Sequence, residues 1–197
     1  KNLIIISGNT PQGIYYGVQT LKQYPVKKDN GFQMTEGLIL DRPDYLWRGV
    51  VPGSTGLSRI DTWMVPLKIN VIYGVPSTGS YEWWQPLNEE YKNNLKEWVE
   101  ECKKRFIIPV AGERPDRGYV RRIKFSDQND ISAILQRYKD YYECGIRDFK
   151  LAFDDGTPSL EYPEDREVFK GLAEAHYHLA SEVYKLLKNL DSDNHLS

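Results

Sequence analysis

The stretch that decides the fold is "GIRDFKLAFDDGTPS", residues 145–159. An apolar run typical of a β-strand ends in two adjacent aspartates, Asp154 and Asp155, and then breaks into Gly-Thr-Pro-Ser. Asp-Asp before Gly is ordinary turn chemistry. Two carboxylates at the end of a buried strand also fit a catalytic acid pair. The surrounding sequence has to separate these two interpretations.

The alternation of side chains along this strand places Asp154. Successive residues of a strand point to opposite faces. The large apolar side chains of "FKLAFD" (149–154) share one face, while Lys150, Ala152 and Asp154 share the other. If the apolar face packs under helices, Asp154 points into a cleft that Asp155, at the strand end, can also reach. Neighbouring carboxylates push each other's pKa values apart, so one can hold a proton near neutrality, which suits glycoside cleavage.

Strand-like and helical patterns alternate along the chain after Pro43. Strands are expected at 45–51, 70–75, 106–112 and 147–155, and helices at 58–69, 87–105, 126–145 and 163–190. Alternating strand-helix units predict an α/β fold with a parallel sheet. No GxGxxG or GxxxxGK[ST] motif supports nucleotide binding. A (β/α)8 TIM barrel needs about 250 residues, so residues 42–197 are expected to hold about its first four βα units.

The first part of the chain has a different rhythm. A strand at 3–7, a helical segment within 10–25 and a strand at 37–41 predict that residues 1–41 are the C-terminal remnant of a small α/β domain. The chain starts without Met and without a signal-peptide pattern. We therefore expect it to be an interior piece of a longer protein.

Composition excludes several classes of function. The net charge is -2 and the basic runs are short, so we expect no nucleic-acid partner. No apolar run reaches the roughly 20 residues that span a bilayer. Cys102 and Cys144 fit no CxxC spacing and are interpreted as free buried thiols. The 5 Trp and 14 Tyr mildly favour a carbohydrate ligand, because sugars stack on aromatic rings.

Several segments resemble one enzyme family. "GIRDFKLAFDD" (145–155) resembles the fourth barrel strand of glycoside hydrolase family 84, the O-GlcNAcase-like and hyaluronidase-like β-N-acetylglucosaminidases. In chain order, the other similar segments are "GIYYGVQTLKQ" (13–23), the end of the preceding small domain; "LDRPDYLWRGVV" (40–51), the first strand; "KINVIYGVP" (68–76), the second; and "WWQPL" (83–87), its loop. Family 20 hexosaminidases are related. The resemblance implies the N-terminal part of a catalytic barrel.

The resemblance also implies a mechanism without a cofactor. Asp154 would orient the 2-acetamido group of the substrate, whose oxygen attacks the anomeric carbon to give an oxazoline. Asp155 would act as general acid and then as general base. Substrate-assisted families are exceptions to the scheme with a carboxylate nucleophile. The expected ligand is an N-acetylhexosamine-containing glycan or glycoconjugate.

Two loops depart from the family pattern. Where the family has Glu-Gly-Phe-Tyr-Gly after the first strand, this chain reads "VVPGSTG" (50–56). Where the family has Lys-Asp-Asp after the second strand, it reads "VPSTGSYEW" (75–83). A divergent enzyme, a non-catalytic carbohydrate binder and a fragment of either all fit, and the intact acid pair favours the first. The candidate sugar contacts are the backbone of Gly49 and the side chains of Tyr81, Trp83 and Trp84.

Other chemistry-bearing residues have plainer interpretations. His176, His178 and His195 are interpreted as surface residues, because their spacing makes no metal site. Glu113 and Arg114 follow the third strand and could face the cleft, but they are interpreted as ordinary loop charges. A half barrel exposes two open sheet edges, so this piece alone is expected to form homo-oligomers, to aggregate or to need further sequence. The compartment is unknown; secretion or a periplasmic location would be favoured for a bacterial glycan hydrolase.

Overall fold

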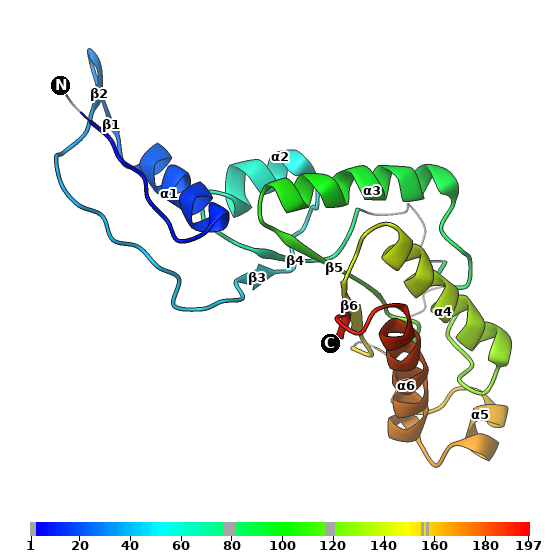
Figure 1. The fold of residues 1–197 in the computed structure, drawn as a ribbon. Helices are drawn as coiled ribbons and strands as arrows, with labels where there is room; N and C mark the ends of the chain where they lie inside the picture. Colours follow the sequence, from blue (N-terminus) through cyan, green and yellow to red (C-terminus); the bar gives the residue numbers. More distant parts are fainter. Residues whose placement is uncertain (1–2, 77–81, 117–120, 155, 157) are drawn as a thin grey trace.

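A computed structural model describes residues 3–76, 82–116, 121–154, 156 and 158–197. Its centre is a five-stranded sheet in which every neighbouring pair is parallel (Figure 1). The strands, in spatial as well as sequence order, are β3 (Gly49–Val50), β4 (Val71–Tyr73), β5 (Ile108–Glu113), β6 (Asp148–Leu151) and β7 (His195–Leu196). The expected α/β class with a parallel sheet is confirmed.

Helices connect the consecutive strands and follow one another along one side of the sheet (Figure 1). They are α3 (Glu89–Lys104), α4 (Gln128–Glu143), and the pair α5 (Pro163–Val168) and α6 (Leu172–Leu190). The side chain of Asn88 accepts a hydrogen bond from the Tyr91 backbone N–H and caps α3, and Asp127 caps α4 in the same way through Asn129. These caps fix both helix starts close to the predicted positions. No helix of the described residues is long and apolar enough to cross a lipid bilayer.

The core lies between the sheet and these helices. Phe149 of β6 is 1% exposed, and its ring centroid lies 6.0 Å from that of Tyr138 on α4. The Tyr138 hydroxyl donates a hydrogen bond to the Lys150 carbonyl oxygen, which ties α4 to the strand. The apolar face of β6 is therefore the helix-covered face, and the side chains that alternate with Phe149 point to the opposite face of the sheet.

The N-terminal part differs from the prediction. The strands expected at 3–7 and 37–41 are wrong: both segments are extended but pair with no strand among the described residues. Their apolar side chains, including Leu3 and Leu40, are largely exposed. An apolar run becomes a strand only when a partner satisfies its backbone. A hairpin that was not expected, β1 (Val26–Lys28) with β2 (Gly31–Gln33), turns at Gly31, whose φ of 133° favours glycine.

Three predictions in the sheet region also need correction. The helix expected over 58–69 is a short turn, α2 (Leu57–Arg59), continued by a π-helical turn, η1 (Ile60–Met64). The helix expected over 163–190 is interrupted at Phe169, which adopts an extended backbone and is 9% exposed. Burial of this ring outweighs continuation of the helix. The sheet also has a fifth parallel strand, β7. It was not predicted, because two residues are too few to give a recognisable strand pattern.

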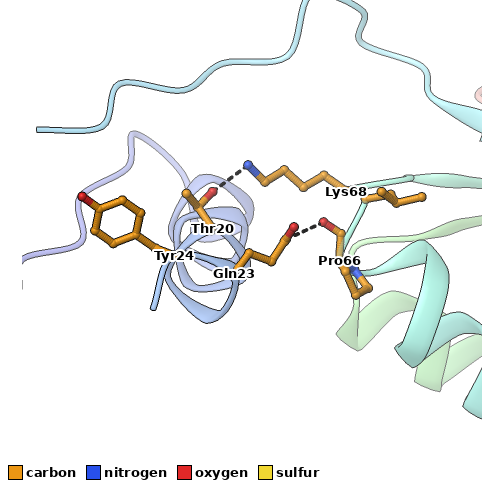
Figure 2. A pocket seen from close by; sticks show the side chains of 6 residues that line it. Thr20, Gln23, Tyr24, Pro66 and Lys68 are labelled. Atoms are coloured by element: carbon orange, nitrogen blue, oxygen red, sulfur yellow. Dashed lines mark hydrogen bonds between the residues drawn. The ribbon is translucent and has the colours of Figure 1, made fainter. Parts of the chain in front are cut away.

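Helix α1 (Pro11–Gln23) docks on the segment that precedes β4, as Figure 2 shows. The Lys68 ammonium donates to the Thr20 hydroxyl at 2.7 Å, and the Gln23 amide donates to the Pro66 carbonyl at 2.8 Å. An open groove of about 410 Å³ lies between the two segments. Because Pro66 and Lys68 come before β4, this groove lies at the amino end of the strands.

Candidate active site

The carboxyl ends of β5 and β6 approach each other closely. Parallel α/β folds place their sites at this edge. Gly112 of β5 pairs with Lys150 of β6, and a Cβ at Gly112 would lie 1.7 Å from the Lys150 carbonyl oxygen. Only glycine permits this approach. The residues that follow the two strands, Arg114 and Asp154, are thereby brought side by side.

Asp154 lies at this edge with its side chain 55% exposed. Its Oδ2 is 3.1 Å from a terminal nitrogen of the Arg114 guanidinium. Such a partly exposed ion pair contributes about 0–1 kcal/mol to stability, so its main effect is to orient the carboxylate. The interpretation of Arg114 as an ordinary loop charge is therefore wrong, because its guanidinium pairs with Asp154. Asp155 lies outside the described residues.

Lys150 lies on the same face of β6, two alternations before Asp154, and is half-buried. Burial lowers the pKa of its ammonium group, and the nearby Arg114 cation lowers it further, whereas Asp154 opposes both effects. The face of the sheet below Asp154 is therefore lined by a cation whose charge is only partly solvated.

A second carboxylate lies close behind this edge. Asp116 is 3% exposed, and its Oδ2 is 3.7 Å from Nε2 of His176 in the first turns of α6. The His176 ring stacks on Phe153, with centroids 3.8 Å apart and planes at 5°. A Cβ added at Gly156 would lie 2.0 Å from the Asp116 carboxylate. The prediction that His176 is a surface residue is wrong, because α6 starts near the carboxyl ends of the strands.

The environment shifts the pKa values of Asp116 and His176 in opposite directions. Burial raises the pKa of Asp116; the His176 imidazole opposes that shift and Asp154 reinforces it. Burial lowers the pKa of His176, and Asp116 opposes that shift. Burial thus destabilises the charged form of each group, and the opposite charge of the partner restores part of that stability.

The predicted sugar-contacting residues are spread along the same sheet and its loops. Gly49 begins β3, where a Cβ would lie 2.8 Å from the Tyr73 ring, so glycine keeps this face open. Trp83 is 3% exposed and donates its indole N–H to the Arg121 carbonyl oxygen. Trp84 is half-buried and meets Trp83 edge to face. Tyr81 lies outside the described residues.

The other charged candidates serve the framework. Glu113 ends β5 but points to the helix side, where it accepts hydrogen bonds from Arg137 at 2.9 Å and from the Tyr141 hydroxyl at 2.7 Å. Glu113 thus forms a largely buried ion pair with Arg137, and its interpretation as an ordinary loop charge is wrong. His195 belongs to β7 and lies 3.2 Å from Asp148. His178 is half-buried near the ring of Phe169.

Sequence reasoning missed Asp116 and His176 as a pair. They are far apart in the chain and belong to no motif. The available signal was topological: Asp116 follows a strand, and His176 lies near the start of the helix after the next strand. Both positions face the carboxyl edge of a parallel sheet. Among the described residues, no group of three or more His, Cys, Asp or Glu side chains could hold a metal ion.

Comparisons with known proteins identify a family and similar folds. Residues 76–197 match the β-N-acetylglucosaminidase (NAGidase) family. A solved mutant of the Thermobaculum terrenum O-GlcNAc hydrolase is similar over 77% of this chain and 34% of its own, with a TM-score of 0.65 and 22% identity. CpGH84B is similar over 75% of this chain and 27% of its own, with a TM-score of 0.57 and 27% identity.

The chain therefore spans about a third of the length of these solved structures. The family match covers β5 to β7, the carboxyl edge with Asp154, and the buried pair behind it. On these grounds the chain belongs to the NAGidase family of β-N-acetylglucosaminidases, glycoside hydrolase family 84.

Proposed function

We propose that the complete protein is a retaining β-N-acetylglucosaminidase that cleaves N-acetylhexosamine-containing glycans or glycoconjugates by substrate assistance. One observation carries the proposal. The Asp-Asp sequence begins three residues after the end of β6, and its first member lies at the carboxyl edge of the sheet beside Arg114. Membership of the family adds support.

In this mechanism Asp154 accepts a hydrogen bond from the acetamido N–H of the substrate. The hydrogen bond increases electron density on the acetamido oxygen, which attacks the anomeric carbon and forms an oxazoline. The ion pair with Arg114 holds the carboxylate in one orientation before substrate arrives. Preorganised charge of this kind favours the transition state, because little reorganisation is needed during reaction.

Asp155 supplies the proton chemistry. As general acid it protonates the leaving glycosidic oxygen, and as general base it then takes a proton from the water that opens the oxazoline. Two inversions at the anomeric carbon give net retention. The lysine below, Lys150, adds positive charge on the face of the sheet from which Asp154 projects.

We extend the proposal to the architecture. Residues 42–197 form the first half of a (β/α)8 barrel, with four βα units and β7 opening a fifth, and residues 1–41 are the remnant of a preceding α/β domain. The successive parallel strands with helices on one side support this. Sugar contacts are assigned to the Gly49 backbone, Tyr81 and Trp84. Trp83, whose ring is buried, supports Trp84 from behind.

The first prediction concerns Asp155. In the complete protein, Asp155→Asn should lower kcat on an aryl β-N-acetylglucosaminide by about 10²–10⁴-fold, the usual contribution of general acid–base catalysis. Asp148→Asn is the matched control, because Asp148 begins the same strand at its opposite end. Stepwise fluorination of the substrate's acetamido methyl should lower kcat/KM, since it weakens the attacking oxygen. Wild-type turnover by Asp155→Asn, or indifference to fluorination, would contradict the mechanism.

A non-catalytic carbohydrate binder is the competing function. The loop after β4, "VPSTGSYEW" (75–83), lacks the Lys and Asp that contact the sugar in the family pattern. This loss favours a binder without catalytic activity. Calorimetry with N-acetylglucosamine distinguishes the two. Binding without turnover of any aryl N-acetylhexosaminide by the complete protein would support the binder.

A further inference from the structure

The buried pair Asp116 and His176 has no part in the proposed mechanism, yet it touches the segment that carries Asp154. Within the described part of the chain, neither carboxylate oxygen of Asp116 has a hydrogen-bond partner, and His176 Nε2 has none either. Buried polar groups are normally satisfied, so unsatisfied ones mark a functional compromise. The His176 Nε2 lies 3.7 Å from Oδ2 of the Asp116 carboxylate.

Two contacts connect the pair to Asp154. Before it in sequence, Phe153 lies flat on the His176 ring. After it, Gly156 lies so close to the Asp116 carboxylate that no larger residue fits without rearrangement. A side-chain movement within the pair therefore reaches the ring of Phe153 on one side of Asp154 and the backbone of Gly156 on the other.

Chemistry limits the charge states of the pair. A neutral carboxylic acid beside a neutral imidazole has the same proton count as a carboxylate beside an imidazolium. Both one-proton states avoid an uncompensated buried charge, whereas loss of that proton leaves a bare carboxylate in a buried site. The one-proton pair is thus the form that fits this environment.

We propose that Asp116 and His176 form a one-proton positioning pair that holds the segment carrying Asp154 in its reactive placement, and that loss of the shared proton releases that segment. The inference rests on the proposed function, because it assigns the pair a role in that reaction. It adds two positioning residues to the site and sets an alkaline limit for activity.

The charges that face the pair support a switch on the alkaline side. Asp154, after β6, repels a bare Asp116 carboxylate, and Arg122, in the loop after β5, attracts it. Arg114 is occupied by its ion pair with Asp154. From α6 the facing titratable group is His176 itself. Burial raises the pKa of Asp116, the His176 imidazole opposes that shift, and Asp154 adds to it.

The test uses kcat against pH in the complete protein with an aryl β-N-acetylglucosaminide. His176→Gln leaves Asp116 without a proton-sharing partner, so kcat should fall about 10- to 100-fold while KM stays within about threefold. The alkaline limb should move about one pH unit lower. His178→Gln, on the same helix and against Phe169, is the matched control and should match wild type.

A double variant separates positioning from simple packing. Asp116→Asn combined with His176→Gln removes the carboxylate that His176→Gln leaves bare. The double variant should therefore recover about tenfold in kcat over His176→Gln alone, a coupling that independent structural residues do not show. No recovery, or a wild-type pH profile for His176→Gln, would overturn the inference.

A second measurement does not depend on activity or on the variant enzyme being active. Selective ¹³C labelling of histidine lets the His176 imidazole be titrated by NMR in the complete protein, with its signal identified from His176→Gln. Asp116→Asn should lower the pKa of His176 by about one unit, because the nearby carboxylate no longer stabilises the imidazolium. An unchanged titration would overturn the pair. If the wild-type protein cleaves no N-acetylhexosaminide, the proposed function fails and this titration alone decides the pair.

Discussion

At the scale of single residues, the site depends on a glycine, because any side chain at position 112 would collide with the neighbouring strand. Gly112 lets β5 approach the backbone of β6 at the position where the two strands end. Arg114, directly after β5, then reaches Asp154, which lies three residues beyond the end of β6. Gly49 differs, because a Cβ there would meet side-chain atoms of Tyr73 and Val71 and no backbone atom among its nearest contacts.

Gly112→Ala should therefore destabilise the protein by about 3 kcal/mol, the upper part of the usual range for overpacking. The added methyl would overlap a backbone carbonyl, which cannot move without breaking the β5–β6 pairing. The free energy of unfolding in urea measures the effect. Gly53→Ala, at a position with nothing within 4 Å of the new Cβ, should stay within about 0.5 kcal/mol of wild type. Equal losses for the two variants would refute this explanation.

At the scale of elements, α5 shows how a short helix is held without a core of its own. Asp165 is 1% exposed, and its carboxylate accepts hydrogen bonds from the backbone N–H groups of Phe125, at 3.1 Å, and Ser126, at 2.7 Å. These bonds join α5 to the loop before α4. The helix can then end at Val168 and turn Phe169 into the core.

Asp165→Ala should cost about 2–4 kcal/mol, because it removes the partner of two backbone donors, one of them buried. Glu164→Ala is the control, because the side chain of Glu164 is 55% exposed and forms a surface ion pair with Lys124. Thermal unfolding of the two variants should differ clearly. Similar midpoints would mean that water replaces the lost carboxylate without penalty.

The sequence predicted those elements whose signals are local. Helices α3 and α4 have side-chain caps and a continuous apolar stripe, so their limits were within a few residues of the structure. The runs at 3–7 and 37–41 have equally apolar residues but no partner strand, and pairing is not a local property. The break at Phe169 depends on where the ring is buried, which periodicity does not reveal.

In the candidate site, too, the sequence predicts local features and misses those that depend on contacts between distant segments. Strand alternation predicted that Phe149 faces the helices, and the structure confirms this orientation. Arg114 was interpreted as a loop charge, since its partner lies on the next strand. The pairing of Asp116 with His176 needs the register of two strands and the start of a helix together. Such a contact follows from tertiary structure and not from any spacing.

At the scale of the whole molecule, the sheet has two unpaired edges, β3 and β7, within the described residues. Helices cover one face. Many large apolar side chains in the N-terminal part are more than half exposed. They include Leu3, Ile5, Phe32, Leu38, Leu40, Leu46 and Trp47. Open edges and exposed apolar surface both favour association.

A polypeptide of residues 1–197 alone should therefore self-associate at micromolar concentration, as light scattering after gel filtration would show. Deleting residues 1–9 should reduce the association without abolishing it, because the two sheet edges are left in place. A monodisperse, thermally stable monomer would contradict the expectation.

The sheet order has a consequence for how the protein is made. Because β3 to β7 pair in the order in which they occur in the chain, each strand finds its neighbour already synthesised when it leaves the ribosome. Every pairing closes a loop of about one strand-helix unit, which keeps the entropic cost of each step similar. Assembly can thus proceed vectorially, one docked unit at a time, during translation. The carboxyl edge with Asp154 would be complete only after α6 has docked and His176 has reached Phe153.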